Sequence, residues 1–229
     1  MIKLTLVQGD CLKYLPKIPS ESIDAIVTDP PYNVLRGGIS KLGLTDNFDW
    51  DNITNYEHFT KTWFTECMRV LKEDSCMFIF WSEKHLNLGL EVFKPSKILI
   101  WHYKNLTSYV ENNFLYDYDF IFLVKKRNPQ LKQEKGKKLS SVFEYSKPQS
   151  NFKEDTAMHP TQKPLKLVEE LIKVSSDVGD VVLDPFLGGG TTMLASLNLK
   201  RSCIGIEIDL KYIEISKKRL NWGKRYEVV

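Results

Sequence analysis

The stretch that decides the fold is Ile23-Asp24-Ala25-Ile26-Val27-Thr28-Asp29-Pro30-Pro31-Tyr32. Its first six residues are mostly β-branched and apolar, which is typical of a buried strand. A carboxylate and an aromatic ring therefore follow the carboxyl end of a strand. The two prolines stiffen the turn and offer carbonyl acceptors without N–H donors. Such a turn fits a substrate that donates hydrogen bonds, for instance the exocyclic amine of a nucleobase, although an ordinary turn at a strand end contains the same residue types.

The composition is that of an ordinary globular protein. The 229 residues are 42% hydrophobic and 27% charged, enough for one large domain with a full core. No apolar run approaches the length of a membrane span, and the N-terminus reads as a strand, so we expect an intracellular protein. Without a C-x-x-C pair we predict reduced thiols and neither disulfides nor a structural metal. The four cysteines are Cys11, Cys67, Cys76 and Cys203.

Strand and helix patterns alternate along the chain, which predicts an α/β fold with a doubly wound, mostly parallel sheet in a single catalytic domain, residues 1–229. The polar, glycine-bearing segment 33–55 is predicted to be a flap beside the site. We expect strands over residues 2–7, 23–28, 76–81, 97–103, 118–124, 181–184 and 203–208. We expect helices over residues 12–18, 56–71 and 86–93, a helix that begins at 164, a helix that follows the glycine turn and ends at 199, and a last helix that begins at 210.

A run of basic residues follows the predicted strand 118–124. Between residues 125 and 138 a single acid, Glu134, stands against seven basic side chains, in a segment to 155 that has little periodicity and reads as loop. It is either a solvated insertion or a loop that contacts nucleic-acid phosphates. The candidate DNA-binding residues are Lys125, Lys126, Arg127, Lys132, Lys135, Lys137 and Lys138.

A glycine-rich turn, Asp184-Pro185-Phe186-Leu187-Gly188-Gly189-Gly190-Thr191-Thr192, lies between a predicted strand and a predicted helix. Glycine lets a ligand approach the backbone, and the helix N-terminus presents free N–H groups. The turn is not a P-loop, and it has Met193 where a dinucleotide fingerprint has its third glycine. Glu207 ends the next strand, 19 residues after Gly188, where an acid can bind a ribose hydroxyl. The pattern favours a nucleoside-bearing cofactor, with a tight structural turn as the alternative.

Three motifs together carry a family resemblance. Asp29-Pro30-Pro31-Tyr32, the glycine turn 184–192 and His159-Pro160-Thr161-Gln162-Lys163-Pro164 resemble the signatures of amino-group DNA methyltransferases that use S-adenosyl-L-methionine (SAM). Their order, with the Asp-Pro-Pro-Tyr motif first and the glycine turn near the C-terminus, resembles the permuted β group. The resemblance implies a Rossmann-like fold with circularly permuted motifs and an inserted recognition region at residues 105–155.

The resemblance also implies residue roles. Asp29 and the Pro30 carbonyl would hold the target amine while Tyr32 stacks on the flipped base, with Pro31 completing the catalytic turn. Glu207 would bind the ribose of SAM. The implied cofactor-binding set is Asp10, Cys11, Asp29, His159, Thr161, Gln162, Lys163, Asp184, Phe186, Gly188, Gly189, Gly190, Thr191, Thr192 and Glu207, in which Asp10 would lie near the adenine and His159, Thr161 and Lys163 over the methionine end.

The leading functional prediction is methyl transfer from SAM to the N6 amine of adenine in duplex DNA, with base flipping and no metal or covalent intermediate. Cytosine-N4 methylation is the alternative that uses the same acceptors. Transfer to RNA or to a protein amide, and a nucleotide-binding module without catalysis, are the other classes. We further expect a cytoplasmic, nucleoid-associated protein whose partners are double-stranded DNA, a second copy of the chain and a companion restriction endonuclease, with no membrane partner.

Overall fold

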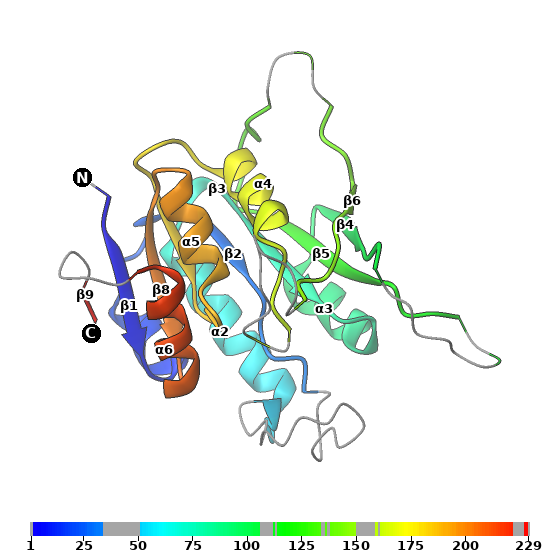
Figure 1. Cartoon of the computed structure of the whole chain (residues 1–229), viewed down its shortest axis with the longest axis horizontal. Helices are drawn as coiled ribbons and strands as arrows, with labels where there is room; N and C mark the ends of the chain where they lie inside the picture. The colour runs from blue at the N-terminus through cyan, green and yellow to red at the C-terminus, as the bar shows by residue number, and fades with distance from the viewer. Residues whose placement is uncertain are drawn as a thin grey trace.

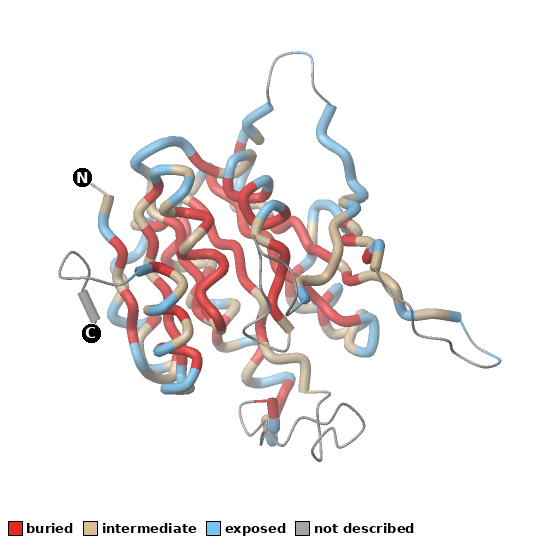
Figure 2. Tube along the Cα trace, viewed as in Figure 1, coloured by how far each residue is buried: buried red, intermediate tan, exposed pale blue. Residues whose placement is uncertain are grey.

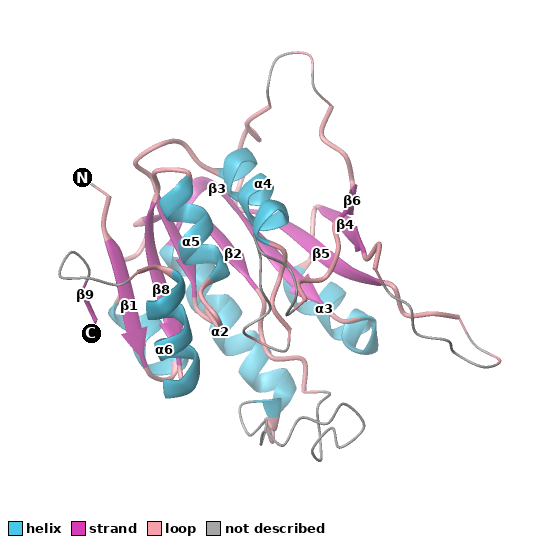
Figure 3. Cartoon of the chain, in the orientation of Figure 1, coloured by secondary structure: helices cyan, strands magenta, loops and turns pink. Residues whose placement is uncertain are grey.

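One sheet with helices on both faces forms the molecule (Figure 1, Figure 3). The structure is a computed structural model and describes residues 2–33, 51–105, 112, 114–133, 136, 138–149, 159, 161–221 and 227–228. Most of the predicted flap and parts of the predicted recognition region 105–155 lie outside these residues, so the division of the chain into a domain and an insertion stays a prediction.

The described residues form nine strands in the order β6-β4-β5-β3-β2-β7-β8-β1-β9. Among them only β5 runs antiparallel to its neighbours, which confirms the mostly parallel sheet. The strands are β1 (Leu4–Gln8), β2 (Ile23–Thr28), β3 (Leu71–Trp81), β4 (Lys97–His102), β5 (Tyr118–Lys125), β6 (Val142–Glu144), β7 (Val181–Asp184), β8 (Ser202–Glu207) and β9 (Glu227–Val228).

Helices α4, α5 and α6 cover one face of the sheet, and α2 and α3 cover the other (Figure 1). Cys11 of α1 packs in the same core cluster as residues of α2 and α3. Buried residues recur every three or four positions along α2, from Tyr56 through Trp63 to Val70, and give it one apolar face. None of the described helices is long and apolar enough to cross a membrane. Their bounds are α1 (Cys11–Tyr14), α2 (Tyr56–Val70), α3 (Leu86–Phe93), α4 (Leu165–Ser175), α5 (Thr191–Asn198) and α6 (Leu210–Arg219), with 3-10 turns η1 (Leu15–Lys17) and η4 (Glu83–His85).

The core lies on both faces of the central strands (Figure 2). Alternate residues of β2 point to opposite sides, so Ile26 packs with Trp63 of α2 while Val27 packs with Val168 of α4. A parallel strand covered on both faces is apolar throughout. This explains why Ile23–Thr28 reads as a continuous apolar run with one acid.

The structure differs from the sequence-based prediction at three elements. The helix expected over residues 12–18 stops at Tyr14 and tightens into η1, because Pro16 has no N–H to continue the α-helical ladder. Strand β3 begins at Leu71, directly after α2, and not at Cys76. Residues 125–155 were expected to be loop throughout, which is wrong at Val142–Glu144, where β6 pairs with β4.

The direction of the strand order reverses between β2 and β7. The chain proceeds from β7 to β8 on one side of this pair and from β2 to β3 on the other. Such a reversal is where α/β sheets bind ligands, at the carboxyl ends of the strands. The two strands pair only at Ala25 with Val182 and at Ile26 with Leu183. Beyond this pairing the chain reaches Asp29 on one side and Asp184 on the other.

Candidate active site

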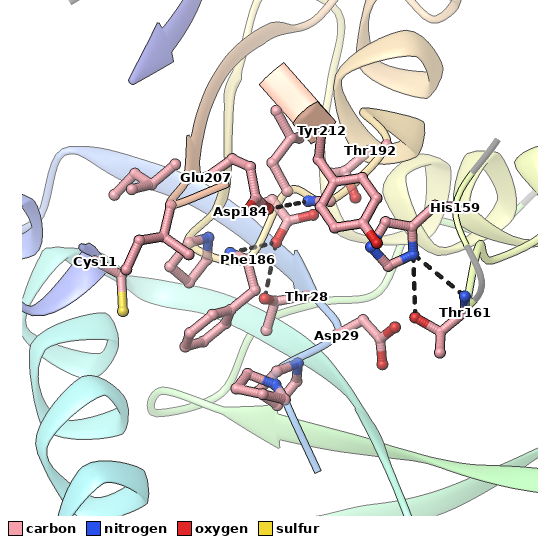
Figure 4. Close-up of a pocket in the computed structure, with 18 of the residues that line it drawn as sticks. Cys11, Thr28, Asp29, His159, Thr161, Asp184, Phe186, Thr192, Glu207 and Tyr212 are labelled. Atoms are coloured by element: carbon pink, nitrogen blue, oxygen red, sulfur yellow. Dashed lines mark hydrogen bonds between the residues drawn. The ribbon is translucent and has the colours of Figure 1, made fainter. Parts of the chain in front are cut away.

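A pocket of about 380 Å³ lies at the carboxyl ends of β1, β2, β7 and β8, a size typical of small-molecule sites. It brings together the three motifs singled out in the sequence (Figure 4). The sequence-predicted residues that line it are Asp10, Cys11, Asp29, Pro30, Pro31, Tyr32, His159, Thr161, Gln162, Lys163, Asp184, Phe186, Gly188, Gly189, Thr191, Thr192 and Glu207. Gly190 is not among the lining residues.

The Asp29 carboxylate is held at both oxygens. Oδ1 accepts a 2.6 Å hydrogen bond from the Tyr32 hydroxyl, and Oδ2 accepts one from the Lys163 ammonium. Burial raises the pKa of Tyr32, so the phenol stays neutral and donates. Lys163 was expected over the methionine end of the cofactor, but the structure places its ammonium on Asp29.

The turn after Asp29 is fixed by a buried tyrosine of α2. The Tyr56 hydroxyl donates to the Pro31 carbonyl over 2.9 Å, and its ring stacks on Trp81 with centroids 6.1 Å apart. The Tyr32 ring meets Trp81 edge-on, at 6.2 Å. The amine-facing role implied for the Pro30 carbonyl, and the stacking of Tyr32 on a base, stay predictions.

The glycine loop has two residues in the left-handed region, Gly188 with φ 52° and Gly190 with φ 83°. A Cβ on Gly190 would lie 2.8 Å from Ser216 Oγ, so this glycine faces α6 and allows the helix to approach. A Cβ on Gly188 would lie 3.3 Å from the His159 ring. The loop is therefore packed between α6 and the segment that carries His159.

Side chains of α6 hold the glycine loop by donating hydrogen bonds to the carbonyl groups of the loop. Ser216 Oγ donates to the Gly188 carbonyl over 2.9 Å. The Arg219 guanidinium donates to the Gly189 carbonyl over 2.6 Å and to Thr191 Oγ1 over 2.9 Å. These bonds turn loop carbonyls towards α6.

Glu207 caps the same loop from the end of β8. Its Oε2 accepts from the Gly188 amide at 2.7 Å, and its Oε1 accepts from the Asp209 amide at 2.8 Å. Burial raises the pKa of Glu207 to about 7, against the opposing effect of these hydrogen bonds. A carboxyl oxygen can accept more than one bond, so a ribose hydroxyl could still bind here.

Asp184 joins the two halves of the site. Its Oδ1 accepts from the Thr28 hydroxyl at 2.8 Å and from the Phe186 amide at 3.1 Å (Figure 4). Burial raises the pKa of this carboxyl to about 6. The bond to Thr28 ties the end of β7 to the end of β2, next to Asp29.

His159 contacts both the glycine loop and α6. Its Nδ1 accepts from the Thr161 amide at 3.2 Å, which leaves the ring proton on Nε2. Its ring packs on Tyr212, with centroids 4.0 Å apart. Burial lowers the pKa of His159 to about 3, so the ring is neutral near pH 7 and Nε2 is a donor on the loop side.

The end of β1 contributes Asp10 and Cys11. The Asp10 carboxylate caps α1 by accepting from the Leu12 amide at 2.9 Å. Burial raises the pKa of the Cys11 thiol, which keeps it protonated. Both residues line the pocket, and their roles at the cofactor stay predictions.

The basic run lies elsewhere. Lys125 pairs with Cys76, which is level with Ala25 near the start of β2, at the edge of the sheet opposite the pocket. In Figure 1 this segment leaves the upper edge, whereas the β1 arrow points to the lower edge. Arg127 contacts Glu73, and Lys132 contacts Asp177 at 2.5 Å. A position this far from the pocket does not favour phosphate contacts by the basic run, and these contacts stay a prediction. Lys135 and Lys137 lie outside the described residues.

Three residues near the site were missed in the sequence. Thr28 ends the buried strand with a hydroxyl, a signal that could have been read. Asp119 is a buried acid within the apolar β5, accepts from Tyr116 at 3.1 Å and has its pKa raised by burial. Tyr212, which packs on His159, gave no signal beyond its place in an amphipathic helix.

Comparison with known proteins agrees with this geometry. The model of the DNA methylase family matches residues 23–218. The chain is 32% identical over 238 residues to the Type II methyltransferase M.HpaI of Haemophilus parainfluenzae, covering 94% of this chain and 74% of that protein. It is 32% identical over 241 residues to the Type II methyltransferase M2.DpnII of Streptococcus pneumoniae, covering 95% and 90%.

Among solved structures, the M1.HpyAVI–SAM complex has a TM-score of 0.72 and 26% identity, and the match covers 96% of this chain and 100% of that one. The family match extends from β2 through the glycine loop into α6, and so includes the three motifs that form the pocket. The chain therefore belongs to the DNA methylase family.

Proposed function

We propose that the chain transfers a methyl group from SAM to the exocyclic N6 amine of adenine in duplex DNA. The observation that carries this proposal is that a carboxylate, Asp29, and a glycine loop before a helix open into one pocket. A cofactor on the loop and a base on Asp29 would then meet inside that pocket. Membership of the DNA methylase family supports the reaction, and the SAM named in the M1.HpyAVI complex supports the cofactor.

The pocket residues fit a nucleoside-bearing cofactor. The backbone of Gly188 and the apolar ring of Phe186 line the pocket. The Glu207 oxygens, which each already accept one hydrogen bond, have further lone pairs that can accept hydrogen bonds from ribose hydroxyls. The neutral His159 can donate from Nε2 to an anionic group such as a carboxylate. When bound, SAM supplies an electrophilic methyl group.

Asp29 is the proposed acceptor for the target amine. The amine lone pair of adenine is delocalised into the ring, so it is a weak nucleophile. An acceptor at its N–H favours a pyramidal nitrogen and stabilises the positive charge that develops there. The Thr28 hydroxyl bond to Asp184 keeps this acceptor at a fixed distance from the glycine loop. Since the amine of a paired base lies inside the duplex, the base has to flip out to reach Asp29.

The choice of adenine rests on the Asp-Pro-Pro-Tyr form of the catalytic turn. Cytosine N4 is the outcome that would replace it, because its amine fits the same acceptors. The relatives are Type II methyltransferases, which supports a restriction–modification role. A companion endonuclease stays a prediction, as does a homodimer, which light scattering with and without DNA would detect.

The test measures transfer of tritiated methyl from SAM to unmethylated genomic DNA, followed by digestion to nucleosides. We expect N6-methyladenine; N4-methylcytosine alone would overturn the choice of base. Asp29→Ala should lower transfer about 100- to 1,000-fold, as loss of a transition-state acceptor does, while SAM binding by calorimetry stays within about threefold. Glu91→Ala removes an exposed carboxylate of α3 and is the matched control. Undiminished turnover in Asp29→Ala would refute the mechanism.

A further inference from the structure

The Lys163 ammonium is enclosed next to the proposed amine site. Its side chain is 7% exposed, and its ion-pair partner is Asp29. Aromatic rings surround it, with the centroid of Phe80 at 5.2 Å, of Tyr32 at 5.6 Å and of Trp101 at 5.9 Å. A cation this buried requires a fixed partner. The surroundings of Lys163 therefore define where the Asp29 carboxylate can lie.

The segment before α4 brings Lys163 to this position. The backbone N–H of Gln162 donates a hydrogen bond to the His159 carbonyl over 3.2 Å. Pro164 precedes the first turn of α4. A Cβ on Gly189 would lie 3.8 Å from Gln162 Oε1, so the same segment packs on the glycine loop. It thus contacts the loop through His159 and Gln162 and contacts Asp29 through Lys163.

The ion pair leaves room for a substrate. A carboxylate offers about four lone-pair positions, and Tyr32 and Lys163 occupy one on each oxygen. A third donor can therefore bind while both existing bonds persist. With Oδ1 and Oδ2 each bonded, the plane of the carboxylate is fixed, and the directions of its remaining lone pairs are fixed with it.

We infer that Lys163 is a positioning residue for Asp29 and not a ligand of the cofactor. Resting on the proposed function, this inference assigns to Lys163 the orientation of the acceptor that receives the target amine. A neutral side chain in its place would free Oδ2 and let the carboxylate rotate. Since a misplacement of about 1 Å at a reacting group can cost about 100-fold in rate, the effect should fall on the chemical step.

The experiment uses the full-length protein, unmethylated genomic DNA and tritiated SAM under single-turnover conditions. Lys163→Met should lower the rate at saturating SAM about 100-fold, with the SAM dissociation constant by calorimetry within about threefold of the wild type. Lys163→Arg keeps the charge and should recover part of the rate. Lys166→Met, which removes an exposed lysine three residues away, should match the wild type.

Two results would overturn the inference. One is a loss of SAM affinity of tenfold or more in Lys163→Met, together with a normal rate once SAM saturates. This result would make Lys163 a cofactor ligand. The other is an unchanged rate in both variants. If the methionine variant fails to fold by circular dichroism, Lys163→Gln and Lys163→Arg decide between the same outcomes. Absence of methyl transfer to DNA by the wild type would instead refute the proposed function.

Discussion

Replacing Gly190 by alanine tests how closely the glycine loop and α6 pack. Gly190 has φ 83°, and a left-handed conformation costs a residue with a Cβ about 1–2 kcal/mol. The added Cβ would also lie 2.8 Å from Oγ, 3.0 Å from Cβ and 3.2 Å from Cα of Ser216. Because the last contact is with backbone, no side-chain rotation relieves it, and overpacking adds about 1–3 kcal/mol. We expect Gly190→Ala to lose about 2–5 kcal/mol of unfolding free energy.

Gly179 provides the matched control. It has φ 93° but no atom within 4 Å of an added Cβ, so Gly179→Ala should lose only the backbone cost of about 1–2 kcal/mol. Urea denaturation measures both losses, and their difference isolates the contact with α6. Ser216→Ala in the Gly190→Ala background should recover part of the loss. Equal losses in the two single glycine variants would refute the steric argument.

Two other predictions concern the groups around the loop. Because burial raises the pKa of Glu207 from 4.5 to about 7, its contribution to stability is present below pH 4.5 and lost as the pH rises through 7, a change on the order of 3 kcal/mol. Glu207→Gln should flatten thermal stability over this window, apart from the slope left by Asp184, and an unchanged pH profile would contradict the burial of this acid. Arg219→Ala removes two hydrogen bonds from a charged donor to the loop, so we expect weaker SAM binding by calorimetry and about 1.5–3 kcal/mol lower stability. Arg219→Lys should restore only part of either, and full retention of SAM affinity in the alanine variant would show that the loop keeps its shape without the Arg219 hydrogen bonds.

The sequence predicted the elements of the site because its local signals agree with its final surroundings. Asp29 follows a strand whose apolar run shows that it is covered on both faces, and the glycines near Gly188 mark a backbone that neighbouring residues approach closely, most closely at Gly190. The order of strands and helices then requires both turns to meet at one edge of a parallel sheet. That is why motifs far apart in the chain could be assigned to one pocket.

Side-chain partners could not be predicted in the same way. The family resemblance implies that Lys163 lies over the methionine end of the cofactor, but only the packing of its segment shows that its ammonium reaches Asp29. For the basic run at Lys125 the sequence leaves both a solvated insertion and a phosphate-contacting loop open, because it does not show that Glu73 and Asp177 approach the run from other elements. The strand β6 is three residues long and has no periodicity to detect.

The position of β1 has a consequence for how the chain folds during synthesis. Leu4 pairs with Cys203, so β1, which is made before the other described strands, lies between β8 and β9, which are made after them. At a translation rate of about 5–20 residues per second, β1 waits roughly 10–40 s for the strand that completes its hydrogen bonds. Until then its apolar face is exposed, and contacts this distant in sequence form slowly. A ribosome-bound chain lacking β8 should therefore hold the catalytic turn and the glycine loop beside an incomplete sheet, and become competent only when β8 pairs with β1.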